Sequence, residues 1–409
     1  MILKKINNKI IIITIVYATA LMGFLLNENS SGGSLKDFNY TYQFILKISE
    51  NLNNGVHSML QENQYHFPLH YIIIGFLLKL FDQIWIVRLI FFHICLLIPL
   101  IFYKCLKSQY KNKDSIFFFS ILIFFSPYFR SSSIWATTDN TALIFFLSST
   151  YFFFQYYQTD KFNMFLYSII FLFLAFYSRQ YYILFIFYLL FLYVCKKKLT
   201  LKKYLITFIT ILLCSIPALL YIFQYYLSNV SNVTGYYSKN FLNNFYIMLS
   251  IIFFYLVPFL IFSKKNILLF FNYFKNKFWV FILISSLILL FSKDFTYGQN
   301  PHGGGIVYKF FYLHINHYFF FVICSLSLMT IFFFFKEKLI NNLSIFTIIL
   351  LCFYFNTIFQ KYFDPLLIIL FSIFFKSSLI KNEIEHFKNN YWKYYSYFFI
   401  FYLISFTYH

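Results

Sequence analysis

The chain has 409 residues, of which 61% are hydrophobic and only 11% are charged, and its mean hydropathy is +0.69. Apolar runs recur along the whole length, and each comes close to the roughly 20 residues that a helix needs to cross a bilayer, which excludes a soluble domain. Barrel strands alternate polar and apolar residues, and these runs do not. We therefore predict an all-α polytopic membrane protein, with a single integral membrane domain over residues 1–409.

The formal net charge of +20 at pH 7 does not indicate a nucleic-acid partner, because the basic residues do not form one face. The lysines come in short clusters between the apolar runs, at residues 4–5, 104–113, 196–203, 264–277, 336–338 and 376–393. This spacing is typical of the positive-inside rule, in which lysine and arginine stay on the cytoplasmic side. The expected partners therefore include membrane lipids and exclude nucleic acid.

The N-terminal residues 1–5, followed by the apolar residues 10–26, resemble a signal peptide without a convincing cleavage site. We expect an uncleaved first span with its N-terminus in the cytoplasm. Residues 27–83 then form the first extracytoplasmic loop. Within it, residues 68–81 are short for a span and predict an interfacial helix. The next span, residues 84–103, then runs inward and brings the following lysine cluster to the cytoplasm.

The remaining apolar runs bring the expected total to roughly 13 spans. They are found near residues 115–129, 140–157, 162–178, 181–195, 204–226, 244–262, 278–292, 317–335, 339–358, 365–376 and 394–408. A late extracytoplasmic loop is expected at residues 293–316. Side chains suited to chemistry gather in the external turns, and no internal sequence repeat of the kind found in many carriers is visible.

No metal ion and no cofactor is expected. The six cysteines lie in or beside apolar runs without CxxC spacing, and we interpret them as small hydrophobic residues. His66 and His70 have the i, i+4 spacing of a zinc pair on a helix, but Pro68 between them breaks a regular helix.

Residues 129–140 form a polar stretch between two strongly apolar runs. An arginine and an aspartate in such a place are costly unless they face water or each other, so Arg130 and Asp139 are candidate functional residues. The alternative is a solvated turn between two helices.

The first extracytoplasmic loop carries Asp37 as an isolated carboxylate, and Glu62 and His66 shortly before the expected interfacial helix. A carboxylate in this place could serve as a general base toward a hydroxyl group. The alternative is a set of solvated loop charges.

Arg179 and Gln180 lie between two apolar runs with almost no loop. The planar guanidinium matches phosphate oxygens in a bidentate way, so Arg179 is a candidate phosphate ligand. The alternative is an arginine that reaches out of the membrane and marks its interface.

Two late segments complete the set of candidates. His302 precedes three glycines, residues 303–305, whose backbone could approach a ligand closely in a lid or substrate loop, unless the segment is a plain connector. Lys361 and Asp364 lie three residues apart before a short apolar run. The lysine could neutralise a leaving phosphate, or the two charges could compensate each other.

These motifs together resemble those of the GT-C membrane glycosyltransferases: Asp37 after the first span, Pro-Leu-x-Tyr at residues 68–71, and an inward span near Arg88. Residues 126–183 more closely resemble the dolichyl-phosphate-glucose α-1,2-glucosyltransferase family. Ala-Thr-Thr-Asp ending at Asp139 and Tyr-Ser-Arg-Gln ending at Gln180 are similar to its Tyr-Thr-Asp and Phe-Arg-Gln stretches. Residues 298–312 resemble its late luminal loop.

The chain also departs from that family. The family has an Asp-Glu pair in the first loop, where this chain has Asp37 followed by Phe38. A late arginine-containing motif is represented here by residues 361–365, which begin with a lysine.

The resemblance implies transfer of a sugar from a polyprenyl-phosphate donor to a lipid-linked glycan, glycolipid or other acceptor on the extracytoplasmic or luminal face. It implies that Asp37 takes the acceptor proton and that Asp139 orients a cation or the acceptor. Such a monophosphate donor requires no metal. The basic residues implied to stabilise the departing lipid phosphate are Arg179, Lys361, Arg130 and His302.

Two other classes remain open. A bacterial O-antigen-type polysaccharide polymerase is also rich in aromatic residues and uses external arginines, but it should have larger external loops in its second half. A carrier or flippase should have charged residues at mid-membrane, and the apolar runs contain very few acidic residues. The compact chain favours a bacterial inner membrane over the endoplasmic reticulum.

Overall fold

The computed structural model of the protein describes residues 2–62, 66–196, 200–233, 240–297, 303–353 and 357–407. Over these residues every regular element is a helix and no strand is present, which confirms the expected all-α architecture. The helices are α1 (Ile2–Leu25), α2 (Ser34–Glu50), α3 (Leu52–Gln61), α4 (Leu69–Phe81), α5 (Ile84–Cys95), α6 (Leu97–Lys107), α7 (Lys113–Ile121), α8 (Pro127–Ile134), α9 (Thr138–Thr159), α10 (Phe162–Phe176), α11 (Phe185–Lys196), α12 (Leu201–Val233), α13 (Phe241–Ile261), α14 (Lys264–Asn276), α15 (Phe278–Phe291), α16 (Gly305–Tyr308), α17 (His317–Phe335), α18 (Leu339–Cys352), α19 (Leu366–Ile373), α20 (Ser378–Glu385) and α21 (Phe387–Thr407). Short 3-10 or π-helical turns lie between some of them, at η1 (Leu122–Phe125), η2 (Gln180–Leu184), η4 (Ser292–Asp294), η6 (Lys309–Ile315), η7 (Lys336–Lys338) and η8 (Gln360–Tyr362).

Asparagine and serine side chains begin several of these apolar helices. Asn51 accepts a hydrogen bond from the backbone N–H of Asn54 at the start of α3, and Ser126 accepts one from Phe129 at the start of α8. Such caps satisfy amides that have no partner inside the helix, so they determine where each helix begins. The same role is played by Asn112, Asn240, Ser263 and Asn316 before α7, α13, α14 and α17.

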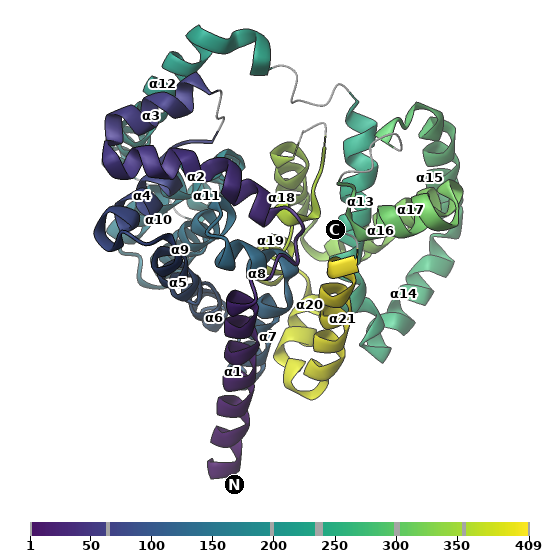
Figure 1. The fold of residues 1–409 in the computed structure, drawn as a ribbon. Helices are drawn as coiled ribbons and strands as arrows, with labels where there is room; N and C mark the ends of the chain where they lie inside the picture. The colour runs from purple at the N-terminus through teal and green to yellow at the C-terminus, as the bar shows by residue number, and fades with distance from the viewer. Residues whose placement is uncertain are drawn as a thin grey trace.

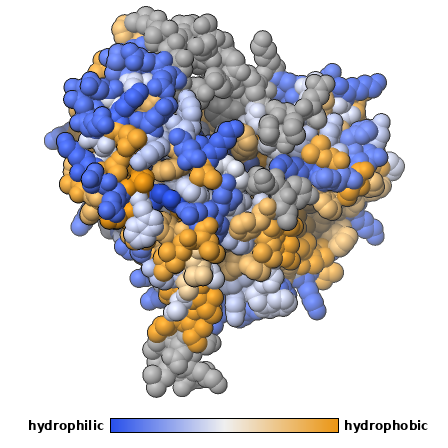
Figure 2. All heavy atoms as spheres, in the orientation of Figure 1, coloured by the Kyte–Doolittle hydropathy of each residue, from blue (hydrophilic) through white to orange (hydrophobic). Residues whose placement is uncertain are grey.

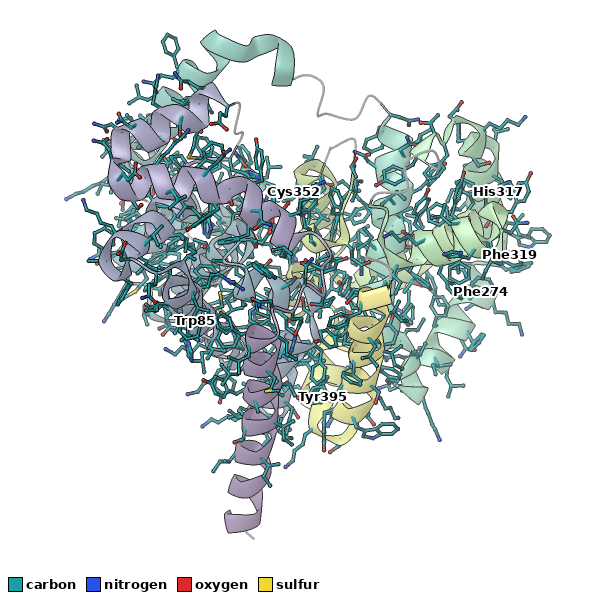
Figure 3. The ribbon with its side chains drawn as sticks, viewed as in Figure 1. Trp85, Phe274, His317, Phe319, Cys352 and Tyr395 are labelled. Carbon is teal, nitrogen blue, oxygen red and sulfur yellow. The ribbon has the colours of Figure 1, made fainter. Side chains whose placement is uncertain are left out.

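The helices form two groups with a central set between them (Figure 1). Helices α2–α6 and α9–α12 lie on one side, α13–α17 lie on the other, and α18–α21 lie between them, while α1 projects from the centre. Within the first group α9 packs along α10, and within the second α13 packs along α17. Cys352, at the end of α18, lies near the middle of the side chains that fill the central region (Figure 3).

The described residues contain four helical segments that are long and apolar enough to cross a membrane, or up to seven if each bent pair counts as one span. The expected count of roughly 13 is therefore not confirmed. Breaks within apolar runs explain much of the difference: the run at residues 113–134 bends by 67° between η1 and α8. The runs on either side of η7 also count together as one segment, His317–Cys352, where two spans were expected.

Exposed apolar side chains agree with an integral membrane protein. In Figure 2 hydrophobic residues cover α1 and the neighbourhood of α21, whereas hydrophilic residues gather over α2 and α3. Trp85 and Phe319 are more than half exposed, at 53% and 57%, on opposite sides of the molecule (Figure 3). Transfer of such apolar side chains from water into lipid is favourable.

The segment expected as the first extracytoplasmic loop, residues 27–83, is itself helical and packed. Helix α2 lies against both α3 and α4. Gly55 of α3 allows this close approach, because a Cβ atom there would lie 2.6 Å from the backbone nitrogen of Ile48. Residues 69–81, expected to form an interfacial helix, form α4; the position of α4 relative to the membrane stays a prediction.

The polar stretch at residues 129–140 is buried, so its interpretation as a solvated turn is wrong. Most of it belongs to α8, where Arg130 is only 7% exposed, and to the first turn of α9. The connection between the two helices places Ala136 at a φ of 46°. This tight turn brings the start of α9, with Asp139, into the interior.

The late loop expected at residues 293–316 is described except for residues 298–302. It contains η4, α16 and η6, and α16 packs against α13. The backbone N–H of Gly304 donates to the carbonyl of Ile358 over 2.7 Å. His302 lies outside the described residues, so its expected role stays a prediction.

Candidate active site

Two ion pairs from distant parts of the chain each contribute one residue, Lys361 and Asp139, to the lining of one cavity. The first joins Asp37 on α2 to Lys361 on η8, with Oδ2 and Nζ 2.6 Å apart. The Asp37 side chain is 43% exposed and that of Lys361 is 18% exposed. A carboxylate from the first loop is thus accessible and held next to an ammonium group from the late segment.

The second ion pair joins Asp139, in the first turn of α9, to Arg179, the residue before η2. Nη2 of Arg179 lies 2.8 Å from Oδ2 of Asp139, and both side chains are buried. Arg179 has extended backbone at the junction between α10 and η2. The carboxylate therefore fixes the direction of the guanidinium.

His66 and Gln180 support this arginine. Nη1 of Arg179 donates to Nε2 of His66 over 2.9 Å, so the proton of the neutral ring is on Nδ1, which lies 3.3 Å from Oε1 of Gln180. Burial, together with the charge of Arg179, lowers the pKa of His66 to about 3. His66 is therefore neutral at physiological pH and able to accept the arginine hydrogen bond.

Two polar atoms of the Asp139–Arg179 pair are buried without a hydrogen-bond partner in the described part of the chain: Oδ1 of Asp139 and Nε of Arg179. Such orphaned atoms are rare in folded proteins and call for an explanation such as a ligand. An arginine with a free Nε–H next to an engaged Nη group can still offer a donor to an anion.

The cavity has a volume of about 10 Å³, which is room for about one water molecule. Its lining comes from α8, α9, η2 and the segment that carries Lys361. The lining residues are Tyr128, Ser132, Asp139, Asn140, Leu143, Tyr181, Tyr182, Lys361, Tyr362, Asp364, Pro365 and Leu366. Charged groups and tyrosines therefore share one small space, and a ligand larger than a water molecule needs more room than the cavity offers.

Asp364 lies in the same cavity but does not pair with Lys361, so the two charges do not compensate each other directly. Its Oδ2 accepts a hydrogen bond from Ser126 over 2.5 Å, and Tyr255 lies beside it. The side chain is 4% exposed and forms no ion pair within the described residues. Of the two alternatives given for this segment, mutual compensation of the two charges is therefore not what the structure shows.

The structure thus brings together seven of the ten residues singled out from the sequence: Asp37, His66, Asp139, Arg179, Gln180, Lys361 and Asp364. Their four charged groups at the two ion pairs sum to zero. An anionic ligand can therefore bind here only if one of the two ion pairs breaks and its cation pairs with the ligand instead.

Arg130 lies elsewhere, in a second buried cluster between α1 and α8. Nη2 of Arg130 lies 2.6 Å from Oε2 of Glu28, and the same nitrogen donates to the carbonyl of Thr19. Gly23 permits this approach, because a Cβ atom there would lie 2.2 Å from Oε2 of Glu28. Arg130 therefore joins helices, and the described contacts give it no route to the cavity.

Glu62 also lies apart from the cavity. Its carboxylate accepts hydrogen bonds from Gln43 over 2.8 Å and from Lys47 over 3.2 Å, and it is 39% exposed. His70 also forms hydrogen bonds within the protein. Its Nδ1 accepts from the hydroxyl of Thr141, and its Nε2 donates to the carbonyl of Ala136. These contacts tie α2 to α3 and α4 to α9.

Sequence reasoning missed the tyrosines of the cavity and the partner of Arg130. Tyr181 directly follows the Arg179-Gln180 motif, and its carbonyl accepts a hydrogen bond from Sγ of Cys352 over 3.4 Å. In a chain with 38 tyrosines no single one stands out. Glu28 carried a usable signal, because it is an acidic residue at the end of the first apolar run.

In the part of the chain that the structure describes, no three His, Cys, Asp or Glu side chains lie close enough together to hold a metal ion. The expectation that no metal takes part stays a prediction.

Comparison with known families supports the superfamily suggested by the motifs. Residues 65–221 match the family model of dolichyl-phosphate-mannose-protein mannosyltransferase, which is of the GT-C type. The match covers less than half of the chain; it includes His66, Asp139 and Arg179 but neither Asp37 nor Lys361. The match does not confirm the resemblance to the dolichyl-phosphate-glucose α-1,2-glucosyltransferase family. No curated protein and no solved structure shows significant similarity to the chain.

Proposed function

We propose that the protein is an integral membrane glycosyltransferase that moves a sugar from a polyprenyl-phosphate donor to a hydroxyl group of a glycan or lipid acceptor on the extracytoplasmic or luminal face. The family match to mannosyltransferases that use a dolichyl-phosphate-linked sugar supports the donor class. The observation that carries the proposal is the arrangement of two ion pairs, Asp37–Lys361 and Asp139–Arg179, beside one cavity that Lys361 and Asp139 line.

In the proposed reaction Asp37 is the general base. The acceptor hydroxyl oxygen forms a bond to the anomeric carbon of the donor sugar while its proton passes to a carboxylate oxygen of Asp37. The partial exposure of this side chain lets an acceptor approach it. The bond from the anomeric carbon to the phosphate oxygen breaks, and the electron pair leaves with the polyprenyl phosphate.

Arg179 and Lys361 stabilise the charge that develops on this leaving phosphate. The donor is a phosphodiester with one negative charge, and the leaving group gains a second, so fixed cations favour the transition state over the ground state. Asp139 and His66 hold the guanidinium of Arg179 in place through two of its nitrogens. Its Nε–H and remaining N–H groups therefore keep a fixed orientation. This arrangement gives the positive charge a fixed position before the donor arrives.

The test is sugar transfer by membranes that contain the protein, with labelled polyprenyl-phosphate sugars as donors. D37N and R179A should each lower the transfer rate by about 100-fold or more while the proteins accumulate normally. E50Q is the matched control, because Glu50 is an exposed acid at the other end of α2, and it should transfer at the wild-type rate.

Each other outcome has a defined meaning. Full activity of D37N would exclude Asp37 as the base and leave Asp139 and Asp364 as the carboxylates that line the cavity. Turnover of diphosphate-linked glycans, with none of any monophosphate-linked donor, would replace the proposal by the polysaccharide polymerase. Movement of a lipid-linked sugar across the bilayer without bond cleavage would replace it by a carrier.

A further inference from the structure

The cavity also contains acidic groups that the phosphate-binding role does not explain. Asp364 lines it together with Tyr128 and Ser132 of α8. Oδ1 of Asp364 and Oδ1 of Asp139 are both buried without a hydrogen-bond donor among the described residues. Because both residues line the same cavity, these carboxylate oxygens point to a ligand rich in hydroxyl groups.

The rest of the lining fits a sugar ring. Tyr181, Tyr182 and Tyr362 contribute aromatic rings to the cavity walls, and rings of this kind pack against the apolar C–H faces of a pyranose. Ser132 is buried at 4% exposure and adds a hydroxyl to the lining. Apolar walls with a few fixed polar groups are typical of small-molecule sites.

Lys361 and Asp364 line the same cavity, so a phosphate bound by Lys361 would place the groups bonded to it close to Asp364. In the donor these groups are a sugar, which carries hydroxyls, and a polyprenyl chain, which carries none. The carboxylate of Asp364 therefore suits the sugar.

We propose that Asp364 selects the donor sugar by binding hydroxyls of a pyranose. This inference rests on the proposed glycosyltransferase function. A cavity with room for about one water must widen to admit a pyranose, so the sugar contacts form only in the donor-bound protein.

The experiment compares donors that carry one hexose and its monodeoxy analogues. The wild-type protein should lose about 10- to 100-fold in kcat/KM with the monodeoxy donor that lacks the hydroxyl bound by Asp364, because a buried hydrogen bond is lost. D364N should be slow with the intact donor and should no longer distinguish it from that monodeoxy analogue.

A binding measurement with polyprenyl phosphate, which carries no sugar, separates this role from a general loss of folding: D364N should bind it as the wild type does. Ser132→Ala, a small change in the same lining, is the second variant and should lower kcat/KM by about 3- to 10-fold. E50Q, far along α2, should keep the wild-type pattern.

If D364N discriminates among the monodeoxy donors as the wild type does, Asp364 is not a sugar ligand and the inference fails while the glycosyltransferase stands. If S132A is also without effect, the cavity does not hold the sugar. If the wild type transfers no sugar from any donor, the proposed function fails and the inference fails with it.

Discussion

Replacement of Arg130 by methionine tests whether this arginine holds helices together or takes part in the chemistry. In the structure the ion pair between Arg130 and Glu28 has side chains that are only 8% and 5% exposed. Methionine keeps much of the volume but leaves the Glu28 carboxylate buried without a counter-charge. Removing one partner of a buried pair costs about 3–5 kcal/mol, so we expect the free energy of unfolding of R130M to fall by that amount.

The double variant E28Q/R130M removes both charges and should recover most of the loss, because replacing a whole buried pair by neutral groups is often nearly neutral in stability. Denaturation of the wild type, both single variants and the double variant in detergent gives the coupling energy directly. Sugar transfer per folded molecule should stay close to that of the wild type in the double variant. Wild-type stability of R130M, or an inactive double variant that folds normally, would refute this reasoning and return Arg130 to the candidate phosphate ligands.

Three further predictions concern neighbouring residues. The pKa of His66 is lowered from 6.5 to about 3, so the neutral ring contributes stability that is complete above pH 6.5 and is lost as the pH falls toward 3. One proton changes the free energy of unfolding by at most about 1.4 kcal/mol per pH unit, and the partial exposure of the ring keeps the slope below that limit. A denaturation series from pH 7 to 4 should show this slope, and H66Q should flatten it. Arg179→Lys keeps the charge but cannot reach both partners of the guanidinium, so the transfer rate should fall by about 100-fold or more, and retention of more than a tenth of the wild-type rate would contradict this. Gly23→Ala places a Cβ atom 2.2 Å from the Glu28 carboxylate and should lower the thermal midpoint, whereas Gly33→Ala, which meets nothing within 4 Å, should leave it unchanged.

The helical class and the core of the site could be predicted from the sequence because both depend on local signals. Apolar runs without alternation indicate membrane helices wherever they occur. Asp139 and Arg179 stand out for a similar reason, since ionisable residues beside such runs are costly and therefore informative. The resemblance implied that Asp139 orients a cation or the acceptor without fixing which, so its pairing with Arg179 was found only in the structure.

The number of spans and the partners of single charges could not be predicted in the same way. A hydropathy window does not detect a 67° bend inside an apolar run. Lys361 has an acid three residues away, yet it pairs with Asp37, which is 324 positions distant. Arg130 likewise finds Glu28 across 102 positions. Such pairings depend on how helices pack, which a single sequence does not reveal.

The ion pair between Asp37 and Lys361 also has a consequence for the order in which substrates bind. Before the donor binds, the ammonium group of Lys361 engages the carboxylate of Asp37. In the proposed reaction a donor phosphate draws Lys361 toward itself and releases the carboxylate, so the acceptor meets a free base only after the donor is in place. We expect compulsory-order kinetics with the donor first. Acceptor binding to the donor-free protein at full affinity would contradict this sequence of events.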